Sequence, residues 1–153
     1  CQLVATCDLA VAADDARFAT SGINAGLFCS TPGVALGRNV GRKQSMQMLL
    51  TGDFIDAVEA REGGLINEVS PAGDLEAATR ARAAKLTAKS AFALTLGKQA
   101  FYRQLEMSIT DAYEFAAAEM ARNMMDRDAA EGVDAFIDKR PPVWDQSRRD
   151  EDD

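Results

Sequence analysis

The chain of 153 residues contains no histidine, and this absence limits the chemistry that its side chains can perform. Histidine is the usual base in Ser-His and Cys-His nucleophilic pairs and the commonest ligand of zinc and haem. The sequence therefore excludes the usual forms of these reaction classes, and we expect no metal site. Three cysteines, Cys1, Cys7 and Cys29, form no Cys-x-x-Cys pair, which indicates reduced thiols that serve as small buried side chains.

The net charge and the composition limit the kinds of molecule that this protein is expected to bind. The chain carries 24 acidic and 17 basic side chains, which gives a formal net charge of -7. This charge repels the phosphates of nucleic acids and anionic lipids, and no apolar run is long enough to span a membrane. We therefore expect a globular protein with no nucleic-acid partner and no membrane partner. Its expected location is cytoplasmic, or the mitochondrial matrix if the source is eukaryotic.

The opening of the chain indicates that it belongs to a longer polypeptide. Position 1 is not Met, and an apolar pattern begins immediately with Cys1, Leu3 and Val4. We therefore expect the chain to be the back part of a longer protein, with the missing N-terminal half of the same polypeptide as one of its partners.

The part of the chain before Pro71 alternates short apolar stretches with Gly, Asp and Pro, which predicts a mixture of strands, turns and short helices. Residues 9–13 and 17–19 are predicted to pair as two strands. Asp14 and Asp15 between them are turn formers, so the expected arrangement is a hairpin.

Three short helices are expected in the same part of the chain, each ended by a glycine, and the first and third begin at a capping residue. They run from Ser30 or Thr31 as the N-cap, with Pro32 in the first turn, to Gly41; from Arg42 to Thr51-Gly52; and from Asp56 as the N-cap, through residues 57–62, to Gly63-Gly64. In the second, Met46, Leu49 and Leu50 share one face of the helix. A strand is expected at residues 65–69.

After Pro71 the hydrophobic period is helical, and helices are predicted at residues 74–88, 91–104, 109–126 and 128–139. The third of these helices has an apolar stripe wide enough to be buried, in the core or at a subunit contact. The stripe consists of Ile109, Ala112, Tyr113, Ala116, Met120 and Met124. Residues 145–153, which end in four acids, are predicted to be a disordered tail.

Three segments of the sequence form a set by their order and spacing. They are residues 1–8 (CQLVATCD), residues 51–60 with 64–69 (TGDFIDAVEA and GLINEV), and residues 136–141 (FIDKRP). Together they resemble the C-terminal half of the crotonase superfamily, the enoyl-CoA hydratases and isomerases, whose signature is T-G-x-x-I-x-A-x-E-A, then G-L-[IV]-x-x-V, and a terminal F-x-x-K-R. Residues 29–33 and 101–105 are similar to the branch called enoyl-CoA hydratase domain-containing proteins.

The resemblance implies an α/β fold. Residues 1–70 would form the end of a crotonase-like β/α spiral core, on the side of the acyl-CoA pocket. Residues 71–144 would form a C-terminal helical trimerisation region, so a homotrimer or a dimer of trimers is implied. Because a fold does not fix a function, the site residues have to be carried over one by one.

The resemblance also implies that the substrate is an acyl-CoA thioester. In this family two backbone N–H groups form an oxyanion hole that polarises the thioester carbonyl and stabilises an enolate. One donor comes from the first half of family members, and the other from a glycine turn just before the helix with which this chain begins. Both donors are expected to lie outside this chain, with Cys1 and Gln2 bordering the site.

Hydration of the double bond needs a base that takes a proton from water and an acid that gives one to the α-carbon, and the hydratases use two glutamates. The matching positions in this chain are Gln2 and Gly22, neither of which can exchange a proton. Losing one such group costs on the order of 10²–10⁴ in rate. The resemblance therefore favours acyl-CoA binding and thioester polarisation over efficient hydratase activity.

The loop around Gly22 is expected to line the acyl pocket, with Ser21, Phe28 and Cys29 as candidate contacts. Among these only the thiol of Cys29 is ionisable, so it is the candidate replacement for a carboxylate. The alternative is that Cys29 packs against its neighbours while Ser30 caps a helix.

Two residues are expected at the nucleotide end of coenzyme A. Lys139 matches the family's C-terminal lysine, which reaches this end, often in a neighbouring subunit, with Arg140 beside it. Met120 stands where the hydratases place an aromatic ring against adenine, and it keeps apolar contact without stacking. The alternative for Lys139 is a cation that the dipole at a helix C-terminus favours. Coenzyme A would enter as part of the substrate, and no separate cofactor is expected.

Two hypotheses of different class follow. The first is an acyl-CoA enzyme of the lyase or isomerase class, of the kind that serves fatty acid metabolism. Its reaction could also be thioester hydrolysis, isomerisation or decarboxylation. The second is a non-catalytic member of the fold that serves as a binding or assembly module.

Overall fold

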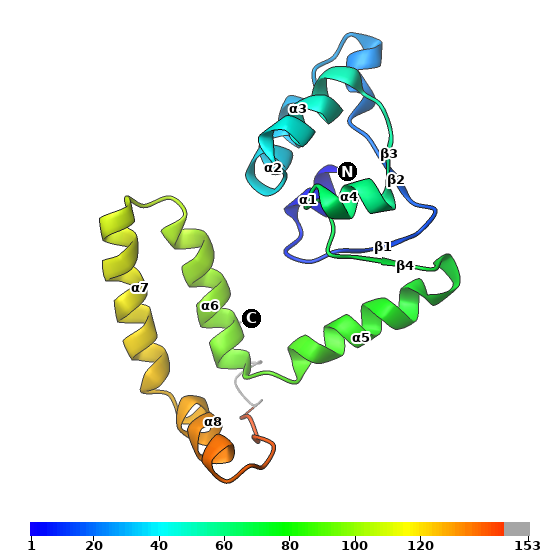
Figure 1. The fold of residues 1–153 in the computed structure, drawn as a ribbon. Helices are drawn as coiled ribbons and strands as arrows, with labels where there is room; N and C mark the ends of the chain where they lie inside the picture. The colour runs from blue at the N-terminus through cyan, green and yellow to red at the C-terminus, as the bar shows by residue number, and fades with distance from the viewer. Residues whose placement is uncertain (146–153) are drawn as a thin grey trace. The chain divides into compact units, whose positions relative to one another are not determined.

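The computed structural model describes residues 1–145, which fall into two compact units, Cys1–Arg82 and a second unit from Ala83 onward (Figure 1). The first unit is mixed α/β, and its elements up to β4 are α1 (Gln2–Thr6), β1 (Val11–Ala13), β2 (Arg17–Phe18), the 3-10 helix η1 (Ser21–Ala25), α2 (Ser30–Asn39), α3 (Arg42–Thr51), β3 (Ile55–Asp56), α4 (Ala57–Glu62) and β4 (Glu68–Ser70). The 3-10 helix η2 (Ala72–Asp74) and α5 (Leu75–Thr87) follow, and α5 continues across the junction of the two units.

The strands form two small sheets, and the predicted hairpin is wrong. β1 pairs in parallel with β4, with Val11 opposite Glu68, whereas β2 pairs antiparallel with β3. The turn at Asp14-Asp15 does form, closed by a 3.1 Å hydrogen bond from Ala16 N to Ala13 O. The hydrogen bonds of β1 are already used by β4, however, and Asp14 N still donates to Ser70 O at 2.8 Å. The chain therefore leaves the turn into a different sheet.

Small and aliphatic side chains make the core of the first unit. α3 contributes Met48 and Leu49 to it, together with Ser45, whose Oγ donates to Leu36 O at 3.2 Å or Val40 O at 3.1 Å. Of the three apolar residues that share a face, Leu49 is buried, whereas Met46 and Leu50 are exposed. The buried face is centred on Ser45, a polar residue whose hydroxyl is satisfied by α2. The core residues are Ala5, Ala12, Leu36, Val40, Met48, Leu49, Ile55, Ala57, Ala60, Leu65 and Ile66.

The predicted caps around α4 are confirmed. The Asp56 carboxylate accepts from Glu59 N at 2.9 Å, and the Glu59 carboxylate accepts from Asp56 N at 3.1 Å, which is a complete capping box. Gly64 ends the segment with a φ of 84°. The strand that follows begins later than predicted, because Leu65 N donates to Ala60 O at 2.8 Å and so still belongs to the helix end.

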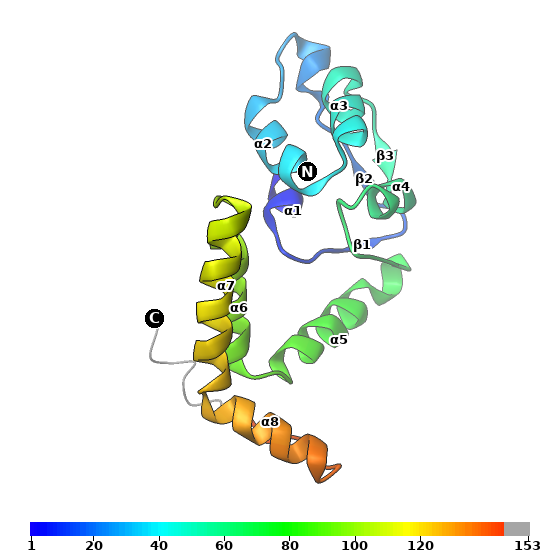
Figure 2. The same ribbon diagram turned by 60° about the vertical axis from the view of Figure 1, so that its left-hand side comes forward.

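As far as residue 145, the second unit contains the end of α5 and the helices α6 (Ala91–Gln104), α7 (Ile109–Met124) and α8 (Arg127–Ile137). α6 and α7 run side by side in both ribbon views (Figures 1 and 2). Ser90, Ser108 and Asp126 cap the three helices with side-chain oxygens. Only Ala112 of the predicted apolar stripe is buried, so this stripe is not part of the core of the described chain.

After α8 the segment Arg140–Asp145, which we call the C-terminal strap, folds back on the second unit. The indole N–H of Trp144 donates to Ala88 O at 2.8 Å, and Asp145 N donates to the buried Asp128 at 3.1 Å. The Ser90 hydroxyl donates to the same carboxylate at 2.5 Å. Asp128 thereby ties the strap and the start of α6 to α8. The predicted tail lies outside the described residues from position 146 on.

No helix within residues 1–145 is both long enough and apolar enough to cross a lipid bilayer.

Candidate functional site

The first helix positions Cys1 and Gln2. Cys1 is the N-cap of α1, its carbonyl accepts from Ala5 N at 3.0 Å, and its side chain packs partly buried against the core. The Gln2 side chain is exposed. Its amide can donate and accept hydrogen bonds and so orient a water molecule, but it cannot take the proton from that water.

Asn39 anchors this helix, and the sequence analysis did not identify it. Its Nδ2 donates to Ala5 O at 2.8 Å, at the carboxyl end of α1, and to Ala35 O at 2.9 Å within α2. Helix α1 has only five residues, so it depends on such contacts from neighbouring elements for its position. No local pattern signals this bond, because Asn39 and Ala5 are 34 residues apart.

Gly22 lies in a loop that leaves no room for a side chain. A Cβ built on Gly22 would be 2.7 Å from Cys29 Sγ and 2.8 Å from the carbonyl oxygen of Leu27. Real Cβ atoms do not come this close to other heavy atoms. The Gly22 carbonyl also accepts from Leu27 N at 3.0 Å, which folds the loop back on itself. Gly22 and Cys29, predicted to share the acyl pocket, are therefore in direct contact.

The signature glycine Gly52 holds this loop against α3. Gly52 adopts a left-handed φ of 67° as the C-cap of α3, and a Cβ there would be 2.7 Å from Ile23 Cγ2. One residue before η1, the buried Thr20 hydroxyl donates to Met48 O at 2.9 Å. The Thr51-Gly52 segment therefore has a structural role: it stops α3 and lets the backbone approach the loop that contains Gly22.

The remaining loop candidates divide into exposed and packed groups. Ser21 and Phe28 are exposed, whereas Cys29 is half-buried and packs against the core. Cys29 is also the N-cap of α2, and the Ser30 hydroxyl donates backward to Phe28 O at 3.3 Å instead of capping the helix. The packing alternative for Cys29 therefore agrees with the structure, and the expectation that Ser30 or Thr31 is the N-cap is wrong.

The coenzyme candidates Met120 and Lys139 both belong to the second unit. Met120 is exposed on α7, and Lys139 follows the C-cap of α8. Lys139 has a φ of 54°, the one positive φ of a non-glycine residue within positions 1–145. The sequence indicated a lysine at a helix end, but not this left-handed backbone, because such positions usually carry glycine.

Cavities are present in each unit away from these candidates. A cavity of about 440 Å³ in the first unit is lined by Gly41, Lys43 and Gln44 together with residues of α4. A cavity of about 190 Å³ in the second unit lies between Arg103 and Arg122 of α6 and α7. No group of three or more His, Cys, Asp or Glu side chains in the described part of the chain is arranged to hold a metal ion.

The match to known proteins defines the class. The family model for enoyl-CoA hydratase/isomerase matches residues 1–148, so the chain belongs to the enoyl-CoA hydratase/isomerase family. This result confirms the crotonase resemblance and the α/β fold expected from it.

Relatives of the branch expected from the sequence are about half identical to this chain. Enoyl-CoA hydratase domain-containing protein 3, mitochondrial, from Xenopus laevis is 50% identical over 147 residues, which cover 96% of this chain and 50% of that protein. The protein of the same name from Mus musculus is 51% identical over 144 residues, covering 94% of this chain and 48% of its own length. The chain thus spans about half the length of the curated relatives that it matches.

Solved structures agree with this assignment. An enoyl-CoA hydratase of Mycobacterium smegmatis superimposes with a TM-score of 0.91 at 56% identity, over 94% of this chain and 56% of that one. Human enoyl-CoA hydratase domain-containing protein 3 superimposes with a TM-score of 0.89 at 49% identity, over 94% of this chain and 57% of that one.

Proposed function

We propose that the complete protein binds acyl-CoA thioesters and polarises their carbonyl through a backbone oxyanion hole, without efficient hydratase activity. Membership of the enoyl-CoA hydratase/isomerase family supports acyl-CoA binding. In this proposal Cys1 and Gln2 border the oxyanion hole, the loop with Ser21 and Phe28 contacts the acyl group, and coenzyme A enters as part of the substrate with no separate cofactor.

The crowding at Gly22 is the observation that carries the second half of the proposal. A glutamate at this position needs a Cβ where Cys29 Sγ and Leu27 O already lie, at 2.7 and 2.8 Å. The Leu27 atom belongs to the backbone, so the loop itself has to move before any side chain fits. This loop therefore supports a reaction in which no carboxylate at position 22 transfers a proton.

The remaining reaction classes use the same polarised carbonyl. Isomerisation and decarboxylation pass through an enolate, and thioester hydrolysis passes through a tetrahedral oxyanion, so each gains from the same two N–H donors. Water addition to the double bond also gains from them, but it requires proton transfer to and from a positioned acid and base. Isomerisation moves a proton from the α-carbon to the γ-carbon, so it also needs a base, which neither Gln2 nor Gly22 can supply. Decarboxylation forms the enolate by loss of CO2 and needs no base, so we place it ahead of the other reactions.

Calorimetric titration of the complete protein with butyryl-CoA, followed by an assay of crotonyl-CoA hydration, tests the proposal. We expect binding without appreciable hydration, and Gln2→Glu alone should not change this result. The double variant Gln2→Glu, Gly22→Glu should lose stability and remain a poor hydratase, because the loop has no space for the second side chain. A gain of several orders of magnitude in hydration would show instead a hydratase site that two substitutions restore, and would overturn the proposal.

A non-catalytic binding module is the second candidate, and the same two positions favour it. A protein with Gln2 and Gly22 in place of the glutamates can still hold a thioester. Turnover of a panel of saturated, unsaturated and carboxylated acyl-CoA thioesters separates the candidates. Binding of several members of the panel with conversion of none supports the module, whereas conversion of any one supports an enzyme.

The location and the assembly of the complete protein are also proposals. The Xenopus laevis and Mus musculus relatives are named as mitochondrial, which conflicts with the cytoplasmic expectation and agrees with the mitochondrial matrix option for a eukaryotic source. Exposed apolar side chains on α7 support the proposed trimer or dimer of trimers.

A further inference from the structure

The end of α8 has an unusual arrangement around Lys139. Arg140 N donates to Ala135 O at 3.0 Å and Lys139 N donates to Phe136 O at 3.3 Å. These two bonds define a Schellman turn in which the residue after the C-cap adopts the left-handed conformation. Glycine is the usual residue there because a Cβ is disfavoured in that conformation. This chain has Lys139 in that place.

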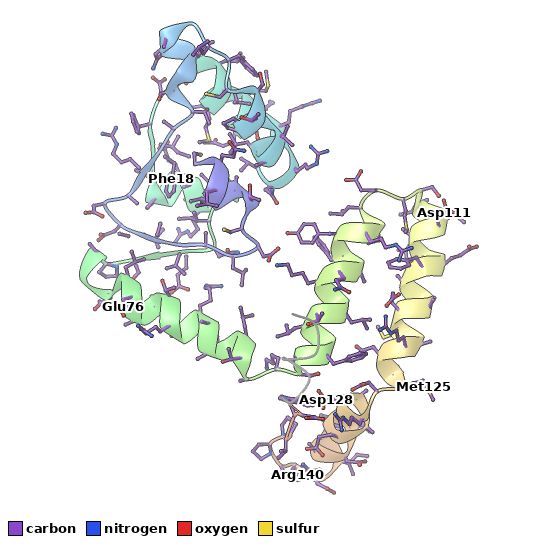
Figure 3. All side chains as sticks on the ribbon, turned by 180° about the vertical axis from the view of Figure 1, so that it is seen from behind. Phe18, Glu76, Asp111, Met125, Asp128 and Arg140 are labelled. Atoms are coloured by element: carbon purple, nitrogen blue, oxygen red, sulfur yellow. The ribbon has the colours of Figure 1, made fainter. Side chains whose placement is uncertain are left out.

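A clamp immediately after Lys139 holds this turn. Both oxygens of the Glu131 carboxylate accept from the Arg140 guanidinium, at 2.6 and 2.9 Å, so the pair is bidentate (Figure 3 labels Arg140). Val143 N donates to the same carboxylate at 2.7 Å. The Arg140 guanidinium also lies 3.5 Å from Asp138, on the other side of Lys139. We call Glu131, Arg140 and the Val143 N–H the Glu131 clamp.

The C-terminal strap secures the far side of the clamp. The Trp144 ring packs on α8 at Gly132, where an added Cβ would lie 3.3 Å from the ring. Asp145 pairs with Arg127, and its N–H donates to Asp128 at the start of α8. The backbone on both sides of Lys139 is therefore fixed by contacts that do not involve the lysine side chain. Strained residues persist where their surroundings determine the conformation in this way, and they concentrate at functional sites.

We propose that the Glu131 clamp is a positioning device that holds Lys139 in the left-handed conformation and so directs its ammonium group toward the nucleotide phosphates of coenzyme A. The inference rests on the proposed function, acyl-CoA binding, and on the expectation from the family resemblance that Lys139 lies at the nucleotide end of the ligand. Glu131 and Arg140 act through Lys139 and do not contact the ligand themselves. The lysine ammonium is a point charge at the end of a flexible side chain, so its contribution to phosphate binding depends on the direction in which the backbone projects that side chain.

Calorimetry on the complete protein tests the inference with two probes, free coenzyme A and S-butyryl pantetheine, which lacks the nucleotide. Lys139→Met should weaken coenzyme A binding about tenfold or more, the value of a hydrogen bond to a charged group. Glu131→Gln should weaken it by roughly threefold to tenfold, less than direct removal of the charge. Neither variant should change the affinity for S-butyryl pantetheine. Asp134→Asn, an acid-to-amide change at an exposed position of the same helix, is the matched control and should affect neither probe.

A double-mutant cycle separates positioning from a general structural role. If Glu131 acts through Lys139, Glu131→Gln adds no further loss of coenzyme A affinity in the Lys139→Met background. Equal losses in both backgrounds, or losses for both probes, overturn the inference. Lys139→Gly should weaken coenzyme A binding as Lys139→Met does, while its unfolding midpoint stays at or above that of the parent, because glycine suits the turn. A lower midpoint for Lys139→Gly contradicts the claim of backbone strain.

The cycle also distinguishes this inference from the proposed function. A parent protein that binds neither probe overturns both. If the Lys139→Met variant binds coenzyme A as tightly as the parent does, the positioning role is overturned and acyl-CoA binding stays in place.

Discussion

At the scale of single residues, Gly22 gives the sharpest prediction. Gly22→Ala should destabilise the complete protein by about 1–3 kcal/mol, because the new Cβ overlaps Cys29 Sγ and the Leu27 carbonyl. Gly37→Ala is the matched control: Gly37 lies inside α2, and its added Cβ meets nothing within 4 Å. That control should be neutral or raise stability by about 0.5–1 kcal/mol. Thermal and denaturant unfolding measure both, and a Gly22→Ala protein as stable as the parent would show that the loop has space.

The sequence identifies Gly22 but not the contact that explains it. The family resemblance predicts that Gly22 and Gln2 stand at the glutamate positions, and this stays a prediction. The contact between Gly22 and Cys29 depends on a left-handed Gly26, with a φ of 77°, and on the bond from Leu27 N to Gly22 O. No periodic pattern encodes such a loop, so its geometry could not be derived from the sequence.

At the scale of elements, the Glu131 clamp makes the end of α8 sensitive to acid. Hydrogen bonds from the Arg140 side chain and from Val143 N lower the pKa of Glu131 from its ordinary value of 4.5 to about 2. The folded-state pKa lies below the unfolded-state value, so the contribution of Glu131 to stability is fully present above about pH 4.5 and is lost as the pH falls toward 2. Carboxyl ¹³C shifts of Glu131 should therefore titrate with a midpoint near 2.

The Glu131→Gln variant serves as the comparison for the pH dependence of the parent. Because Glu131→Gln removes the titrating group, the free energy of unfolding of this variant should fall less steeply with pH between 4.5 and 2 than that of the parent. Above this window the two curves should run parallel. Parallel curves through the whole range, or a Glu131 midpoint near 4.5, would show that the clamp does not form in solution.

Elements whose signals are local were predicted well, and those that depend on distant partners were not. The capping box of α4 and the stop of α3 at Gly52 involve residues within a few positions of each other, and both are confirmed. The hairpin prediction was wrong because β1 pairs with β4, with Val11 opposite Glu68. No local pattern in the sequence indicates that β1 pairs with β4 instead of β2. The buried face of α3 includes Ser45, which is buried through bonds to α2 that an apolar pattern does not register.

At the scale of the whole molecule, the apolar stripe of α7 requires a cover that the described residues of its own unit do not provide. Ile109, Tyr113 and Met124 are 75%, 74% and 62% exposed, and Met120 beside them is 63% exposed. Monomeric proteins seldom leave a continuous stripe of this kind in water, whereas assemblies bury it. The stripe was predicted to be buried in the core or at a subunit contact, and it is exposed in the single chain, so the second alternative is the one that we develop.

Substitution within this stripe should therefore change the assembly of the complete protein. Burial of a methionine side chain contributes roughly 1.5–3 kcal/mol, so Met124→Glu should raise the dissociation constant of the proposed trimer by about tenfold or more per interface. Glu114→Gln, on another face of the same helix, is the matched control and should leave assembly unchanged. Sedimentation equilibrium over a range of protein concentrations measures both variants. A Met124→Glu protein that assembles as the parent does would show that the stripe faces something other than a neighbouring subunit, and the missing half of the same polypeptide would then be the covering surface to test.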